Sequence, residues 1–200
     1  MTTAPLGPEK VRASFLAAMD STQGIVEAVT AGEWSRATPC DEWDVRDVVN
    51  HLVYENLWAV ELFNGKTIAE VGDALEGDLV GDAPREKYVE SAAAVRKIIE
   101  QPDSMSVTCH ISSGPVPGSE YASQLFLDTL IHGWDIAVGA GQSGVLPADL
   151  VEACMPLALM VRDAVPDSGP FSSEVQTADS VDPQTKLLAI LGRNADEWKN

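Results

Sequence analysis

The stretch Tyr121–Val138, YASQLFLDTLIHGWDIAV, is the most informative part of the sequence, because its apolar residues recur at the spacing of a buried helical face. Two ionisable side chains, Asp128 and His132, fall on the same stripe as Leu125 and Ile136. A lone buried carboxylate is too costly to keep, so buried charges are normally paired or coordinate a metal. The stretch therefore predicts a core helix that carries a carboxylate and an imidazole one turn apart.

Further helices are expected on both sides of this one. Apolar residues at helical spacing predict them over about residues 8–32, 45–63, 85–100 and 147–165, with a short helix over about 184–191. Asp44 can cap the second of these, Asn64-Gly65 can end it, and Pro156 should kink or divide the helix that contains it.

The remaining segments predict a small extended insert and two loops. Residues 106–111 favour extended structure and are followed by turn residues at 113–118, which indicates a short strand or hairpin. Residues 66–84, with one short turn, and 166–183 are expected to be loops. The sequence thus predicts an all-α fold, a helical bundle with extra short helices and a small hairpin insert, in one domain over residues 1–200.

The composition excludes several classes of partner. With 13 Lys and Arg against 31 Asp and Glu, the formal net charge is −18, which disfavours nucleic acid and anionic membrane surfaces. Three widely spaced cysteines and the lack of an N-terminal basic and apolar signal pattern predict a cytoplasmic protein. No stretch has the length of a membrane span, and a homodimer is compatible with the sequence.

A third side chain, that of His51, can join the pair in the core helix. His51 lies at the border of the apolar face of the 45–63 helix, partly inward, with Glu55 one turn later. From a facing helix, His51 could supply a third ligand to a metal held by Asp128 and His132. The same spacing fits a plain ion pair within one helix, with His51 as a polar border residue, and both readings stay open on spacing alone.

Three segments resemble a known family. Residues 38–52, TPCDEWDVRDVVNHL, and residues 128–137, DTLIHGWDIA, resemble the two motifs of the actinobacterial branch of the DinB-like superfamily, and residues 186–193, KLLAILGR, resemble its usual end. Members of that branch include the N-terminal domain of mycothiol-dependent maleylpyruvate isomerase. The resemblance implies a four-helix bundle that holds a divalent metal, most often zinc, with nickel or another transition ion as the alternative.

Carried over to this chain, the implied ligands are His51, Asp128 and His132. The isomerase has a glutamate at the position of Asp128, and it has a second, C-terminal domain, whereas here only about sixty residues follow the 121–138 helix. Maleylpyruvate isomerisation itself therefore does not follow from the resemblance.

The implied chemistry is a metal-dependent transferase, in which a small thiol of the mycothiol type attacks an electrophilic small molecule. A non-catalytic metal-binding or interaction module and a metal-dependent hydrolase are the alternatives. Around the ligands, Glu55 or Asp135 could accept imidazole protons, and Trp134 and His110 could line a pocket.

Overall fold

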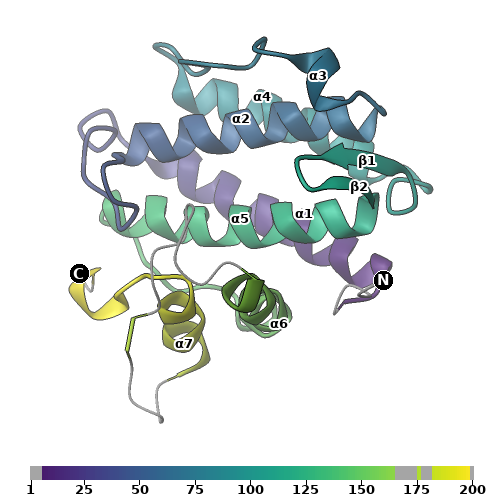
Figure 1. Cartoon of the computed structure of the whole chain (residues 1–200). Coiled ribbons are helices and arrows are strands. Elements are labelled where there is room, and N and C mark those ends of the chain that lie inside the picture. The colour runs from purple at the N-terminus through teal and green to yellow at the C-terminus, as the bar shows by residue number, and fades with distance from the viewer. Residues whose placement is uncertain (1–5, 165–174, 177–181, 199–200) are drawn as a thin grey trace.

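The computed structural model describes residues 6–164, 175–176 and 182–198, and four long helices form its centre (Figure 1). They are α1 (Pro8–Ala28), α2 (Val45–Phe63), α4 (Pro84–Ile99) and α5 (Gly118–Gly139). Helices α1 and α2 each pack against both α4 and α5, which closes a four-helix bundle. The all-α prediction and its small extended insert are confirmed.

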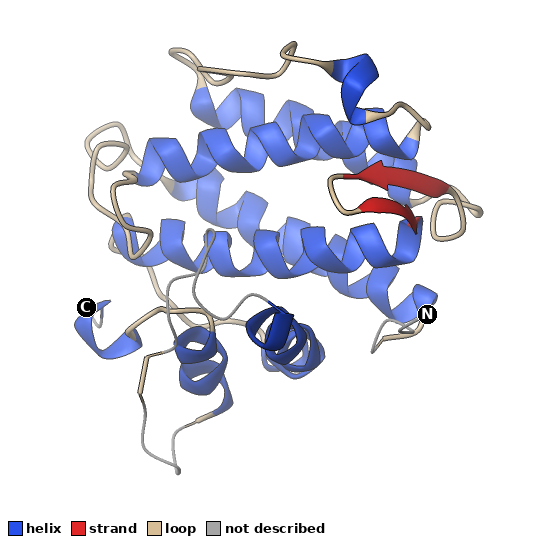
Figure 2. Ribbon diagram, in the orientation of Figure 1, coloured by secondary structure: helices blue, strands red, loops and turns tan. Residues whose placement is uncertain are grey.

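The remaining elements lie around the bundle (Figure 2). They are α3 (Ile68–Val71), the antiparallel strands β1 (Thr108–Ile111) and β2 (Gly114–Pro117), α6 (Ala148–Ala164), α7 (Pro183–Ile190) and the short 3-10 helix η1 (Ala195–Trp198). Helix α6 packs on α5 and α1, and α7 packs on α6, so these two helices add a layer outside the bundle. Within the described ranges, no helix has both the length and the apolar character needed to cross a bilayer.

Local signals place α2 where the sequence predicted it. The Asp44 side chain accepts a hydrogen bond from the backbone of Asp47, whose own side chain accepts one from the backbone of Asp44, a reciprocal capping box. The helix ends at Phe63, and Gly65 adopts the positive φ of +86° that a glycine tolerates best. These two signals set the bounds of α2, and its apolar stripe sets the face that it buries.

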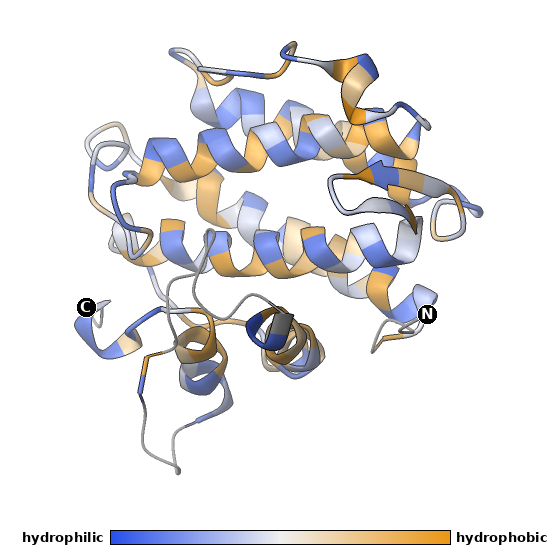
Figure 3. Ribbon diagram, in the orientation of Figure 1, coloured by the Kyte–Doolittle hydropathy of each residue, from blue (hydrophilic) through white to orange (hydrophobic). Residues whose placement is uncertain are grey.

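Helix α5 is buried on nearly every side, because α1 and α2 cover one side of it and α6 the other. Orange and blue residues alternate along it in Figure 3, so polar groups also enter the interior. Gly133 allows the closest approach to α1, since a Cβ atom there would lie 2.4 Å from Oγ1 of Thr22. That hydroxyl donates a hydrogen bond to the carbonyl of Thr129 at 3.1 Å.

Some boundaries differ from the prediction. Helix α1 ends at Ala28 and not near Gly32, and Val29 takes an extended conformation while remaining fully buried. Pro156 does not divide α6. Because Glu152, whose carbonyl loses its partner there, is exposed, water can take the place of the missing hydrogen bond. Most of the loop predicted over residues 166–183 lies outside the described residues.

Candidate metal centre

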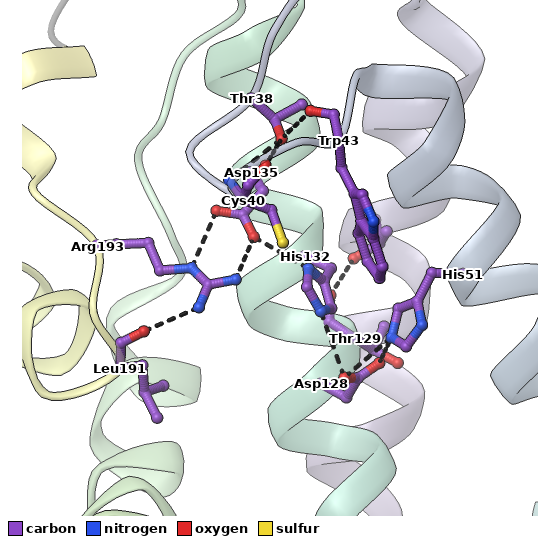
Figure 4. A network of polar contacts seen from close by, with 11 residues as sticks. Thr38, Cys40, Trp43, His51, Asp128, Thr129, His132, Asp135, Leu191 and Arg193 are labelled. Atoms are coloured by element: carbon purple, nitrogen blue, oxygen red, sulfur yellow. Dashed lines mark hydrogen bonds and ion pairs between the residues drawn. The ribbon is translucent and has the colours of Figure 1, made fainter. Parts of the chain in front are cut away.

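Two neighbouring helices bring His51, Asp128 and His132 together (Figure 4). His51 Nε2 on α2 lies 3.2 Å from Oδ2 of Asp128 on α5. One turn further along α5, His132 Nε2 lies 3.5 Å from the other carboxylate oxygen of Asp128. The structure therefore gathers the three residues that the sequence placed on facing helical stripes.

The spacing of these donor atoms fits a divalent transition metal. One ligand atom from each residue lies within 4.8 Å of the other two. Zinc bonds of about 2.0–2.2 Å in a tetrahedron place ligand atoms roughly 3.3–3.6 Å apart. The distances from His51 and His132 to Asp128 are close to that value, and two imidazoles with one carboxylate are a donor set that zinc, nickel and cobalt accept.

A further carboxylate orients the His132 ring. Asp135 is fully buried, and its Oδ2 lies 3.0 Å from Nδ1 of His132. This contact favours the tautomer in which Nδ1 donates to Asp135, and Nε2, on the side of Asp128, would then be the nitrogen that ligates a metal. Asp135 in turn accepts hydrogen bonds from Arg193, whose side chain comes from the segment after α7.

Opposite charges dominate the electrostatics of the trio. Burial by itself lowers the pKa of His51, but the Asp128 carboxylate, helped by Glu55, raises it by more, and the pKa ends above its usual value. Burial likewise opposes ionisation of Asp128, yet His132, His51 and Arg193 hold the pKa of Asp128 below its usual value. The centre therefore holds an ionised carboxylate between two imidazoles. A metal cation that bound there would displace a proton from the imidazole nitrogens that face Asp128.

Glu55 is a neighbour of the trio on α2. Burial, with the negative charge of Asp128, raises the pKa of Glu55 to about 7, and His51 acts in the opposite direction. Its carboxylate does not join the trio of atoms within 4.8 Å of one another. Glu55 thus lies within electrostatic range of the centre.

An aromatic ring covers the centre beside a small cavity. The Trp43 ring lies 5.1 Å from the ring of His51 and 6.0 Å from that of His132, measured between centroids. A cavity of about 360 Å³ is lined by Trp43, Asp47, Asn50, His51 and Tyr54. The His51 side of the centre is therefore the side that faces this cavity.

Two residues considered for the pocket lie elsewhere. His110 lies in β1 of the hairpin, where its backbone bridges to Thr67. Trp134 is buried on another face of α5 and lines a different cavity, of about 490 Å³, together with residues such as Trp198. Neither residue belongs to the trio.

Sequence reasoning missed Arg193, and the structure also places Cys40 beside the centre. Cys40, His132 and Asp135 also offer ligand atoms within 4.8 Å of one another. Burial raises the pKa of Cys40 to about 11, so its thiol is protonated near neutral pH, and Asp135 is already engaged by Arg193. The trio of His51, Asp128 and His132 is therefore the better candidate for a metal site. The sequence held one signal for Arg193. It is a basic residue that follows the apolar run at the end of the chain's last α-helix after a single glycine.

The chain is similar to several known proteins. Two proteins of Mycobacterium tuberculosis, each described as uncharacterized and from different strains, are 29% identical over 182 residues, which is 88% of this chain and 93% of theirs. The crystal structure of the mycothiol-dependent maleylpyruvate isomerase superposes with a TM-score of 0.60 at 19% identity, over 80% of this chain and 72% of that chain. This likeness shows a shared fold.

A family model described as the mycothiol maleylpyruvate isomerase N-terminal domain matches residues 15–137. The match runs from within α1 to near the end of α5 and includes all three residues of the trio. Since it spans more than half of the chain, the chain belongs to the mycothiol maleylpyruvate isomerase N-terminal domain family.

Proposed function

We propose that this protein binds one divalent transition metal, zinc in the first instance, through His51, Asp128 and His132, and that it transfers a small thiol to an electrophile. The observation that carries the proposal is the convergence of two imidazoles and one carboxylate within 4.8 Å of one another. The family supports a thiol of the mycothiol type as the co-substrate.

The proposed chemistry needs an open coordination position. Three protein ligands leave a position free in a four-coordinate site, and a metal there lowers the pKa of a bound thiol. Thiolate is the nucleophilic form of a thiol. The residues of the chain hold the geometry: Asp135 fixes the His132 ring, and Trp43 shields one side of the centre from water.

The cavity beside His51 is the proposed entry for the thiol. Its lining contains the Asn50 amide, which is already held by the carbonyl of Gly77 and the backbone N–H of Leu79. The amide is thereby fixed as part of the wall. Trp43 and Tyr54 give the same cavity two aromatic surfaces, against which the carbon skeleton of a thiol or an electrophile can pack.

Metal content tests the first half of the proposal. The protein is purified without a chelator or a metal-binding tag, and bound metals are measured by mass spectrometry. We expect one equivalent of metal in the wild type, and a loss of most of it in H51A and H132A. H110A is the matched control, because His110 lies in the hairpin and should leave metal content unchanged. Wild-type protein that neither carries nor takes up zinc would refute the proposal.

Thiol transfer tests the second half. Mycothiol and 1-chloro-2,4-dinitrobenzene are mixed with protein. The thiol sulfur forms a bond to the ring carbon, chloride leaves, and the thiol proton passes to solvent. We expect a rate above the uncatalysed reaction that is lost in H132A and retained in H110A. A metal-loaded protein inactive with thiols but active on an ester substrate would favour the hydrolase instead.

A further inference from the structure

Arg193 is a buried arginine that reaches the candidate centre from outside the bundle. It follows α7, and only 3% of its surface is exposed. Its Nη2 donates to Oδ2 of Asp135 at 2.8 Å, and its Nε lies 3.3 Å from Oδ1 of the same carboxylate. Its Nη1 donates to the carbonyl of Leu191 at 2.8 Å. These contacts fix both the place and the plane of the guanidinium group.

The same carboxylate oxygen connects Arg193 to the histidine. Oδ2 of Asp135 accepts hydrogen bonds from Arg193 Nη2 and from His132 Nδ1, at 2.8 and 3.0 Å. Arg193, Asp135 and His132 therefore form a continuous chain of charge-assisted contacts that ends at a proposed metal ligand (Figure 4). All three side chains are almost or completely removed from solvent, so water does not weaken this chain of contacts.

We propose that Arg193 is a positioning residue of the metal centre, which acts through Asp135 to hold His132 Nε2 toward Asp128 and His51. This inference rests on the proposed metal binding. Without the guanidinium, Asp135 loses the partner that fixes its plane, and the His132 ring loses its fixed acceptor. Such outer hydrogen bonds to a ligating histidine typically change metal affinity by about 10–100-fold.

A purely structural role for Arg193 makes a different prediction. If Arg193 only neutralised a buried charge, its removal would lower stability while leaving the donor atoms, and thus the metal affinity of the folded protein, unchanged. If it acts through Asp135, the affinity falls, and the fall disappears once Asp135 can no longer orient the ring. The two roles are separated by combining substitutions at both positions.

The experiment measures Zn²⁺ affinity by chelator competition, and the absorption spectrum of the Co²⁺-loaded protein, for wild type, R193M, R193K, D135N and the double variant D135N/R193M. The matched control is R46M, because Arg46 also binds a carboxylate, that of Asp78, through short hydrogen bonds of 2.8 and 2.7 Å at the protein surface. Circular dichroism of each metal-free variant verifies that it is folded.

We expect R193M to bind Zn²⁺ about 10–100-fold more weakly than wild type and to shift the Co²⁺ bands. R193K should be intermediate, since an ammonium group cannot reproduce the two-pronged contact. In the D135N background, R193M should have no further effect, and R46M should match wild type.

A folded R193M whose Zn²⁺ affinity lies within twofold of wild type, with unchanged Co²⁺ bands, would overturn the inference while leaving the metal site intact. If R193M does not fold, R193K is the deciding variant. A Zn²⁺ affinity of R193K equal to that of wild type would then overturn the inference. A wild type that binds no Zn²⁺ overturns both this inference and the proposed function.

Discussion

The close contact between α1 and α5 gives a quantitative prediction for G133A. A Cβ atom at position 133 would lie 2.4 Å from Thr22 Oγ1 and 3.3 Å from both Thr22 Cβ and Cγ2. Overpacking of this kind costs about 1–3 kcal/mol. Replacing glycine by alanine inside a helix raises the free energy of unfolding by about 0.5–1 kcal/mol when the added methyl group meets no clash. We therefore expect G133A to lower the free energy of unfolding by up to about 2.5 kcal/mol.

Two comparisons separate overpacking from helix propensity. Gly24 lies inside α1, and a Cβ there meets no atom within 4 Å, so G24A should stabilise the protein by about 0.5–1 kcal/mol. In a T22A background the closest clashing atom is gone, and G133A should become neutral or stabilising. Unfolding in urea, followed by circular dichroism with a chelator present, measures all these variants without a contribution from metal. If G133A stabilises the protein as G24A does while Thr22 is intact, the reasoning is wrong.

Three further predictions concern the centre. C40S should keep the metal content of wild type, because Cys40 lies outside the trio; loss of metal in C40S would favour the alternative cluster with His132 and Asp135. Burial and the charge of Asp128 raise the pKa of Glu55 from 4.5 to about 7, so ionisation of Glu55 destabilises the folded protein by up to about 3 kcal/mol above pH 7, and this effect disappears only well below pH 4.5, where the carboxyl is protonated in both states. Metal-free E55Q should therefore be more stable than wild type at pH 8, and most of this difference should be lost at pH 4.5, as urea titrations at the two pH values would show. Finally, Zn²⁺ at 100 times its dissociation constant should add about 2.7 kcal/mol to the stability of wild type and nothing to that of H132A, measured by thermal melts with and without a chelator.

Local signals in the sequence were sufficient for most of the fold. The bounds of α2 follow from the Asp44 cap and the Asn64-Gly65 stop, which act over a few residues. The end of α1 was mispredicted because Val29 continues the apolar spacing, and its burial arises from tertiary packing outside the helix. The spacing of apolar residues indicates which residues are buried. Near a helix end, a residue can be buried without being helical, so this spacing does not locate the end of the helix.

The residues of the trio could be predicted because they lie in local sequence patterns. The contact of Arg193 with Asp135 could not be predicted in this way. His51, Asp128 and His132 each lie on a helical stripe, and the family motifs contain all three. Arg193 lies 58 residues after Asp135 in the chain, so no local pattern connects the two. The meeting depends on α6 and α7 packing back over α5, which is tertiary information.

The order of these residues along the chain has a consequence for biosynthesis. During translation, α2 and α5 emerge first and can already bring His51 and Asp128, 77 residues apart, into contact. Asp135 is synthesised 58 residues before Arg193, the buried arginine that pairs with its carboxylate. We therefore expect the carboxylate of Asp135 to stay hydrated, with His132 as its partner, until Arg193 is available to pair with it.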